Sequence, residues 1–123
     1  MMADPALAAY LKSTGRTHVG LYGGETHGAV LQTCLDLLAA GYKVSMVVDA
    51  TSSYNAADRN VALARMRDSG ALMATFQSLI FELERTFEHP MAKPMLSIFK
   101  EAPPHSLDLI EDHVVRVPLV KSD

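Results

Sequence analysis

Residues 17–50 read THVGLYGGETHGAVLQTCLDLLAAGYKVSMVVDA, and this stretch decides the fold class. The apolar run over 18–22 stops at two glycines, which predicts a buried strand that leaves into a tight turn. Between 26 and 40, apolar residues recur at three- and four-residue steps and Gly41 follows, so we expect a helix that ends in a left-handed residue. The β-branched run over 43–50 predicts a second strand. A strand, a helix and a strand joined by short links indicate parallel strands with a right-handed crossover.

The alternation of strands and helices continues on both sides of this stretch. We therefore expect an open α/β sheet of three parallel strands, which normally needs helices on both faces. Pro94 has to lie in the first turn of the last helix or bend it. The further elements that we predict are a helix that Asp4 and Pro5 begin and Gly15 ends, a helix over 56–69 that Gly70 closes, a strand within 71–76, a helix over 79–87 that Ser78 caps, and a helix over 91–100.

The strand at 18–22 has no earlier strand in the sequence to pair with. An unpaired edge presents a row of backbone hydrogen-bonding groups, so we expect another element or molecule to cover it. At the other end of the chain, residues 105–123 mix SLDLIEDH with the β-branched VVRVPLV, and Pro118 predicts an edge strand or an extended arm. We interpret this segment as a tail, separate from a domain over residues 1–104.

Composition and charge exclude several classes of protein. A chain of 123 residues, 49% of them hydrophobic and 20% charged, is long enough for one domain with a core and is typical of a soluble globular protein. The net charge of -3 gives no basic surface for nucleic acid, although a place beside nucleic acid within an assembly stays open. One cysteine rules out an internal disulfide framework, and no apolar run is long enough for a membrane span. We expect a soluble intracellular protein, cytoplasmic or organellar.

Two polar loops follow predicted strands, at Gly23–Ala29 and Asp49–Ser53. Ligands of open α/β sheets bind beyond the carboxyl ends of the strands, so these loops form the candidate site. A helix that begins near Thr26 would present free amides and the positive end of its dipole to an anion or an oxyanion. Alternatively, the glycines only permit the turn and Thr26 caps the helix, and the residues alone favour this structural interpretation.

Several motifs together resemble the second half of the isochorismatase-like hydrolases, and within these the isochorismatase domain-containing subgroup. In that subgroup a strand ends in G-x-E-T-H-x-C, and a helix follows with Q-T-x-L-x-L. Then come G-x-x-V-x-x-V-x-D-A, S-S, A-L-x-R-M, S-G and an H-P turn. Matching residues extend from about 1 to 104, including FKEAPPHS near the end. The resemblance implies part of a doubly wound, mostly parallel α/β (Rossmann-like) domain with flanking helices.

The same resemblance implies a cysteine nucleophile at the helix start, assisted by an aspartate and a lysine from the earlier part of the domain. Ala29 occupies the nucleophile position in this sequence and Gly28 precedes it, so neither residue can attack a substrate. The aspartate and the lysine would lie before Met1, because the first residues resemble the stretch after that lysine. The turn 23–25 is implied to hold a non-proline cis peptide bond and oxyanion amides. We expect the vestigial pocket to be formed by Gly24, Glu25, Thr26, His27 and Gly28.

Other reactive side chains receive structural interpretations. Cys34 lies five residues beyond Ala29, about 7.5 Å further along a helix, so we expect it to pack in the core as a small apolar side chain. We expect His27 to make local hydrogen bonds at the helix start and Asp49 to bond amides of its own loop. The remaining histidines show no metal-ligand spacing, so we predict no metal site, no cofactor, and solvated or capping roles for His18, His89, His105 and His113.

These observations lead to a first hypothesis of a catalytically inactive domain that acts as a structural or interaction subunit. Its partner would be a second copy of the chain or a larger, possibly organellar assembly that buries the open strand edge. An alternative hypothesis is a cysteine hydrolase of a small amide or ester, whose first half and nucleophile are missing from this chain. A third hypothesis is a non-catalytic binder of a small anion at the Thr26 helix start.

Overall fold

A three-stranded parallel sheet lies at the centre of residues 4–101, the part of the chain that the computed structural model describes. Both strand pairings are parallel, so the predicted α/β sheet is confirmed. The strands follow one another across the sheet in chain order, and they are β1 (His18–Gly24), β2 (Lys43–Ser52) and β3 (Leu72–Ala74).

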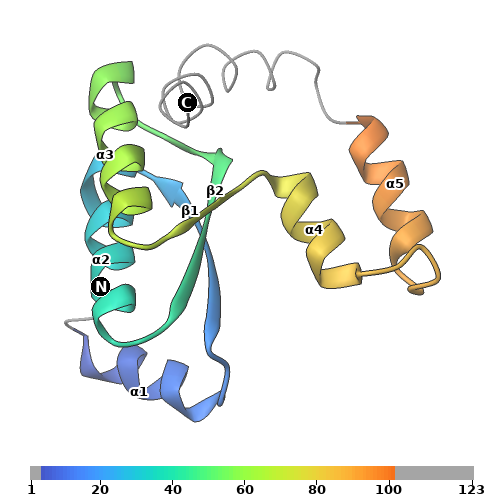
Figure 1. Ribbon diagram of the computed structural model, residues 1–123, viewed down its shortest axis with the longest axis horizontal. Coiled ribbons are helices and arrows are strands. Elements are labelled where there is room, and N and C mark those ends of the chain that lie inside the picture. The colour runs from blue at the N-terminus through green and yellow to red at the C-terminus, as the bar shows by residue number, and fades with distance from the viewer. Residues whose placement is uncertain (1–3, 102–123) are drawn as a thin grey trace.

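Helices lie on both sides of the sheet. Within the described residues they are α1 (Pro5–Ser13), the π-helical turn η1 (Thr26–Val30), α2 (Leu31–Ala39), α3 (Ala56–Asp68), α4 (Phe76–Glu84) and α5 (Ala92–Glu101). Figure 1 shows α2 and α3 together on one side of the strands, and α4 and α5 on the opposite side. Local signals set the start of α1 and the ends of α2 and α3. Asp4 Oδ1 accepts a hydrogen bond from the Ala6 amide at 2.9 Å at the start of α1. Gly41 and Gly70 adopt φ of 90° and 111° after α2 and α3.

One predicted helix is divided. The prediction placed a single helix over 26–40, but the segment begins as a π-helical turn in which Gly28 has φ of -104° and ψ of -112°. Regular α-helix starts only at Leu31. The periodicity of the apolar residues is continuous across this kink, which is why the sequence did not indicate it.

A second predicted helix begins earlier than expected. The prediction took Ser78 as its cap, but Thr75 caps α4: Thr75 Oγ1 accepts from the Ser78 amide at 3.2 Å, and Ser78 Oγ accepts from the Thr75 amide at 2.9 Å. Ser78 therefore lies inside α4, as the reciprocal partner of the cap. Arg85 ends the helix with φ of 64°. The predicted boundary at 104, the tail at 105–123 with Pro118, and the histidines at 105 and 113 lie outside the described residues.

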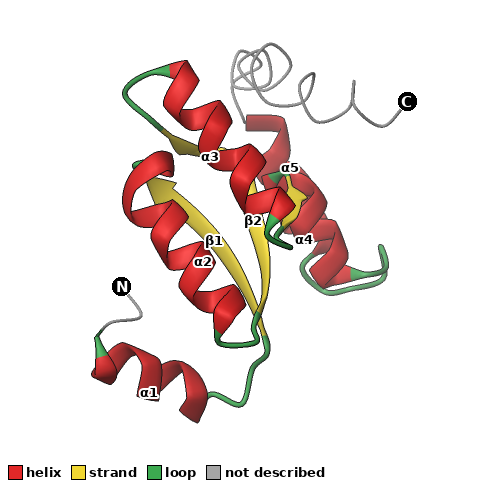
Figure 2. Cartoon of the chain, turned by 60° about the vertical axis from the view of Figure 1, so that its left-hand side comes forward, coloured by secondary structure: helices red, strands yellow, loops and turns green. Residues whose placement is uncertain are grey.

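The hydrophobic core lies between the sheet and the α2–α3 pair, which run side by side in Figure 2. Alternate residues of β2 face this core, and Val44, Met46 and Val48 are at most 4% exposed. Burying side chains of this size contributes about 1.5–3 kcal/mol each, so this layer is the main source of stability. The other buried members of the core are Val30, Leu31, Cys34, Leu37, Ala62, Leu63, Met66 and Ala71.

The face of the sheet towards α4 is more polar. There β2 presents Ser45, the buried Val47 and Asp49, and Asp49 Oδ1 accepts from the Phe76 amide at the start of α4 at 2.7 Å. α4 and α5 contact each other through aromatic rings, because the Phe99 ring lies edge-on to Phe76 and Phe81 at centroid distances of 5.7 and 5.4 Å. This side of the molecule is thus held by a few polar and aromatic contacts.

Candidate functional site

The two predicted loops lie side by side in the fold. The register of β1 on β2 shifts after Leu21, and the pairing resumes with Gly23 opposite Thr51. The turn after β1 and the end of β2 therefore form one surface at the carboxyl edge of the sheet. The peptide bond between Gly24 and Glu25 is cis, as the resemblance implied.

A chain of hydroxyl groups fastens the turn to β2. Thr51 Oγ1 donates to the Gly23 carbonyl at 2.7 Å, and Thr26 Oγ1 lies 2.7 Å from Thr51 Oγ1. Because Thr51 has a single hydroxyl proton and uses it on Gly23, Thr26 is the donor of the second bond. Thr26 is fully buried. The prediction that Thr26 caps the helix is wrong, since its hydroxyl bonds across the sheet and η1 has no side-chain cap.

His27 joins the first loop to the second. Its Nδ1 atom lies 2.9 Å from Ser53 Oγ and 3.5 Å from Glu25 Oε2, and its Nε2 atom lies 4.0 Å from Asp58 Oδ2. Glu25 Oε2 also accepts a hydrogen bond from the Tyr54 amide at 3.2 Å. The prediction of local hydrogen bonds for His27 is therefore wrong, because its hydrogen-bonding partner, Ser53, lies 26 residues away in the sequence.

Ser53 and His27 have the spacing of a nucleophile and its general base. In a working pair, a third group hydrogen-bonds the other ring nitrogen and orients the ring. Here Asp58 approaches Nε2 only to 4.0 Å, beyond hydrogen-bonding distance, and Glu25 approaches the same Nδ1 that faces Ser53. The arrangement holds the two loops together, and within the part of the chain that the structure describes, no acceptor hydrogen-bonds Nε2 to orient the ring.

Ala29, the predicted nucleophile position, lies on this surface. It follows Gly28 in η1, and its side chain is exposed. A methyl group carries no lone pair and no ionisable proton, so this position supports no covalent chemistry. Gly28 also departs from helical geometry, so the regular row of helix amides that an anion site at Thr26 requires does not form.

The one cysteine of the chain lies in the core. Cys34 is 0% exposed and forms no disulfide. Burial raises the pKa of its thiol above the ordinary value of 9.0, so the thiol is protonated at neutral pH. The prediction of apolar packing is confirmed.

Asp49 and Arg59 support the far side of the second loop. The prediction that Asp49 bonds its own loop is wrong, because its partner is the Phe76 amide, 27 residues later. Arg59 Nε donates to the Thr51 carbonyl at 3.3 Å, and its Nη2 donates to the Val48 carbonyl. Burial lowers the pKa of Arg59, and the Asp49 carboxylate acts in the opposite direction. Together the two side chains hold the end of β2 in place.

Thr51, Ser53 and Arg59 have partners that sequence reasoning missed. The run TSS at the end of a buried strand could have indicated the partners of Thr51 and Ser53, because hydroxyl side chains at that end of a parallel sheet lie next to the loop of the neighbouring strand. Arg59 gives no such signal, because it looks like one charge among several on a helix and its partners are backbone carbonyls.

The other described histidines make hydrogen bonds away from the turn. His18 Nε2 lies 2.8 Å from Ser45 Oγ, and His89 Nδ1 accepts from the Met91 amide at 3.1 Å. Across residues 4–101, no three His, Cys, Asp or Glu side chains gather in a way that could hold a metal ion. Nor does that part of the chain contain a helix with the length and apolar character needed to cross a membrane.

Comparison with known proteins gives a consistent result. A family model described as Isochorismatase domain matches residues 1–78. Isochorismatase domain-containing protein 2A of Mus musculus is 48% identical over 103 residues, which are 83% of this chain and 50% of the mouse protein. The solved structure of MAR1 ribonuclease from Caenorhabditis elegans has a TM-score of 0.75 and 38% identity, covering 83% of this chain and 53% of that one. YcaC from Escherichia coli, described as an octameric hydrolase of unknown specificity, has a TM-score of 0.76 and 25% identity, covering 89% of this chain and 53% of that one. This chain thus spans about half the length of the proteins that it matches.

Proposed function

This chain belongs to the isochorismatase family, and we propose that it is a catalytically inactive member that acts as a structural or protein-interaction subunit. The observation that carries the proposal is Ala29, which stands where the resemblance implies a cysteine nucleophile. The match covers half of the mouse relative, so the activity of a whole relative does not extend to this chain by itself.

The chemistry that the position would need is specific. A thiolate forms a bond to the carbonyl carbon of an amide or ester, and the amine or alcohol leaves after taking a proton from a general acid. Water then hydrolyses the resulting thioester and restores the thiol. Ala29 is exposed on the turn, so a substrate could reach the position. The methyl group has no electron pair to form the first bond, so the covalent intermediate cannot form at this position.

Neighbouring groups do not replace the missing sulfur. Cys34 is fully buried and protonated at neutral pH. The Ser53 hydroxyl has His27 beside it, but no carboxylate of residues 4–101 hydrogen-bonds the far ring nitrogen. The Thr26 hydroxyl is buried and donates to Thr51. Each of these groups already takes part in holding the fold.

A role in protein interaction is supported by apolar side chains on the α4 side of the sheet. Tyr22, Leu83 and Phe87 are 71%, 70% and 76% exposed. Met91 and Ile98 are also exposed, so the segment from α4 to α5 carries several large apolar side chains at the surface, a feature typical of protein-contact surfaces. The E. coli neighbour is described as octameric, which agrees with an oligomeric role.

The alternative is a cysteine hydrolase of a small amide or ester whose nucleophile and first half come from outside this chain. The observation in its favour is the series of hydrogen bonds from Thr26 through Thr51 to Gly23. These bonds keep the turn in place, although the side chain at position 29 carries no reactive atom. The E. coli neighbour is described as a hydrolase, and the C. elegans neighbour as a ribonuclease. A net charge of -3 gives no separate support for nucleic acid.

Placing a thiol at the turn separates the two functions. We would compare the unmodified chain with Cys34→Ala and with the double variant Ala29→Cys, Cys34→Ala, using iodoacetamide labelling and hydrolysis of p-nitrophenyl acetate and small primary amides. The unmodified chain and Cys34→Ala should neither label under native conditions nor raise hydrolysis above the buffer rate. The double variant should label readily, because position 29 is exposed.

Labelling of the double variant without turnover of any amide would match an inactive turn. Thiol-independent turnover by the unmodified chain would overturn the proposal outright. Turnover that appears only in the double variant would favour a cysteine hydrolase, with the difference that the turn would need its nucleophile and not the first half.

A further inference from the structure

The connection from α4 to α5 forms a small cavity of its own. Arg85 ends α4 with φ of 64°, and the Thr86 amide donates to the Glu84 carbonyl at 2.8 Å. This tight turn brings Phe87 back towards Phe81, and the two ring centroids lie 6.2 Å apart. The cavity has a volume of about 180 Å³, and its described walls are Phe81, Glu84, Arg85, Thr86 and Phe87.

Glu84 brings a buried charge to this cavity. It is 7% exposed, and it is the one charged side chain among the buried residues of 4–101. Its Oε1 atom is buried without a hydrogen-bond partner, and no ion pair within the described part of the chain includes it. The other two buried side-chain oxygens in this condition, on Thr33 and Asn60, belong to neutral groups. A carboxylate costs much more to bury without a counter-charge than a neutral group does, so Glu84 has the strongest requirement for a partner.

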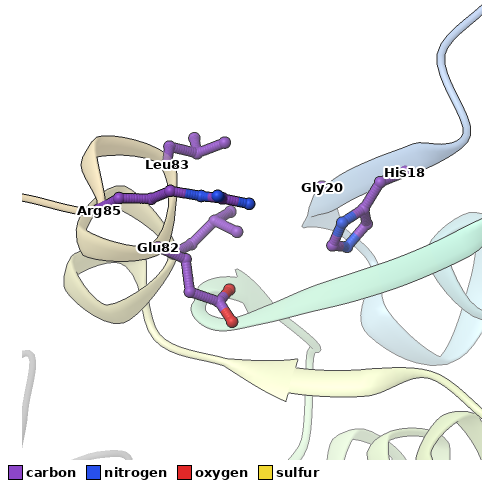
Figure 3. Close-up of a pocket in the computed structure, with 6 residues that line it drawn as sticks. His18, Gly20, Glu82, Leu83 and Arg85 are labelled. Carbon is purple, nitrogen blue, oxygen red and sulfur yellow. The ribbon is translucent and has the colours of Figure 1, made fainter.

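The neighbouring Arg85 does not supply that counter-charge. Figure 3 shows its side chain extending towards His18, into a second cavity between α4 and β1. The remaining walls favour a cation, because the carboxyl end of a helix is the negative end of its dipole and aromatic rings attract positive charge. The described walls all come from residues 81–87, and this chain itself buries Glu84. Neither feature therefore arises from the half of its relatives that the chain does not span.

We propose that this cavity binds an alkylammonium group, with the Glu84 carboxylate as its counter-ion and the rings of Phe81 and Phe87 against its carbon atoms. A volume of about 180 Å³ equals that of about six water molecules at about 30 Å³ each, which is room for an ammonium group on a short alkyl chain. A metal ion would need further ligands, and no three His, Cys, Asp or Glu side chains of residues 4–101 gather to supply them. The proposal does not depend on Ala29 and goes beyond the inactive turn.

Titration of the full chain with n-butylammonium chloride tests the site. We would follow it by isothermal calorimetry and by two-dimensional amide NMR at constant ionic strength, with n-butanol as the neutral analogue. Butylammonium at up to about 50 mM should shift the amide signals of residues 81–87, and n-butanol should not. This measurement uses the unmodified chain, so it does not depend on how well a variant folds.

Substitutions then assign the binding groups. Glu84→Gln keeps the shape of the side chain and removes its charge, so it should weaken butylammonium binding about tenfold or more. Glu82→Gln, the same change on the exposed surface of α4, should leave the affinity unchanged. Phe87→Leu removes a ring that is 76% exposed and should weaken binding about two- to fivefold.

A second ligand distinguishes the two sources of an alkylammonium group. Nα-acetyl-lysine N-methylamide that binds as tightly as butylammonium would assign the site to a lysine side chain of another polypeptide. Its exclusion, while butylammonium binds, would assign the site to a small free amine. Failure of both amines to shift the signals of residues 81–87 overturns the proposal. So does an affinity that Glu84→Gln leaves unchanged, or equal binding of n-butanol.

Discussion

The two faces of the sheet differ in how completely their helices are packed. On one face α2 buries four residues, among them Cys34 and Leu37, whereas on the other α4 buries only Glu84. Both helices follow a strand and both have an apolar side, so helix formation by itself does not decide burial. The strand face opposite differs: β2 presents Val44, Met46 and Val48 to α2 and α3, but only Val47 as an apolar residue, between Ser45 and Asp49, to the α4 side. The first face supplies most of the buried apolar area, and the second keeps large apolar side chains such as Leu83 exposed.

The largest expected effect contrasts one leucine from each face. Leu37→Ala removes a side chain that is 2% exposed and should lower the free energy of unfolding by about 2–5 kcal/mol. Leu83→Ala truncates a side chain that is 70% exposed and should change it by less than about 0.5 kcal/mol. Urea denaturation measures both free energies. Equal losses would show that α4 is packed as firmly as α2.

Helix caps give an intermediate effect and sharpen the comparison. Asn55 Oδ1 accepts from the Asp58 amide at 2.8 Å at the start of α3, and Thr75 caps α4. Substitution of either residue by alanine should cost about 1 kcal/mol. For Asn55→Ala the loss should appear in global unfolding, because α3 contributes to the core.

For Thr75→Ala the loss should appear as faster hydrogen exchange confined to α4, because that helix can open without exposing the core. Hydrogen exchange with mass spectrometry distinguishes the two patterns. Faster exchange in α2 and α3 after the Thr75 change would mean that the two faces unfold together.

The smallest effect concerns the pH dependence of the better-packed face. Burial raises the pKa of Cys34 above 9.0, so above that pH the unfolded chain releases the thiol proton while the folded chain retains it. The folded state then binds more protons, and the free energy of unfolding falls as pH rises from 9. Cys34→Ala should remove this part of the slope between pH 8 and 10.5. An identical slope in both proteins would show that Cys34 ionises freely in the folded state.

The secondary structure could be predicted because its signals are local. Asp4 and Pro5 begin α1, and Gly41 and Gly70 end α2 and α3. Each of these signals acts on the backbone conformation of residues close to it in the sequence. The failures occurred where a local signal competed with a distant partner. Thr26 has the residue type of a cap, but its hydroxyl bonds Thr51, and Asp49 reaches α4 instead of its own loop. These bonds depend on the strand register, which no local pattern encodes.

The amino-acid sequence by itself determined the order of strands and helices, the family, and the alanine at position 29, because periodicity, capping residues and motif identity are written along the chain. Only the tertiary structure decided that Thr26 and His27 face Thr51 and Ser53 across 25 and 26 residues. It also decided that His18 of β1, Glu82 of α4 and Arg85 border one cavity. The physical reason is that such contacts arise from strand pairing and helix packing. Both bring together groups that are far apart in the sequence, and the spacing of those groups along the chain does not predict the contact.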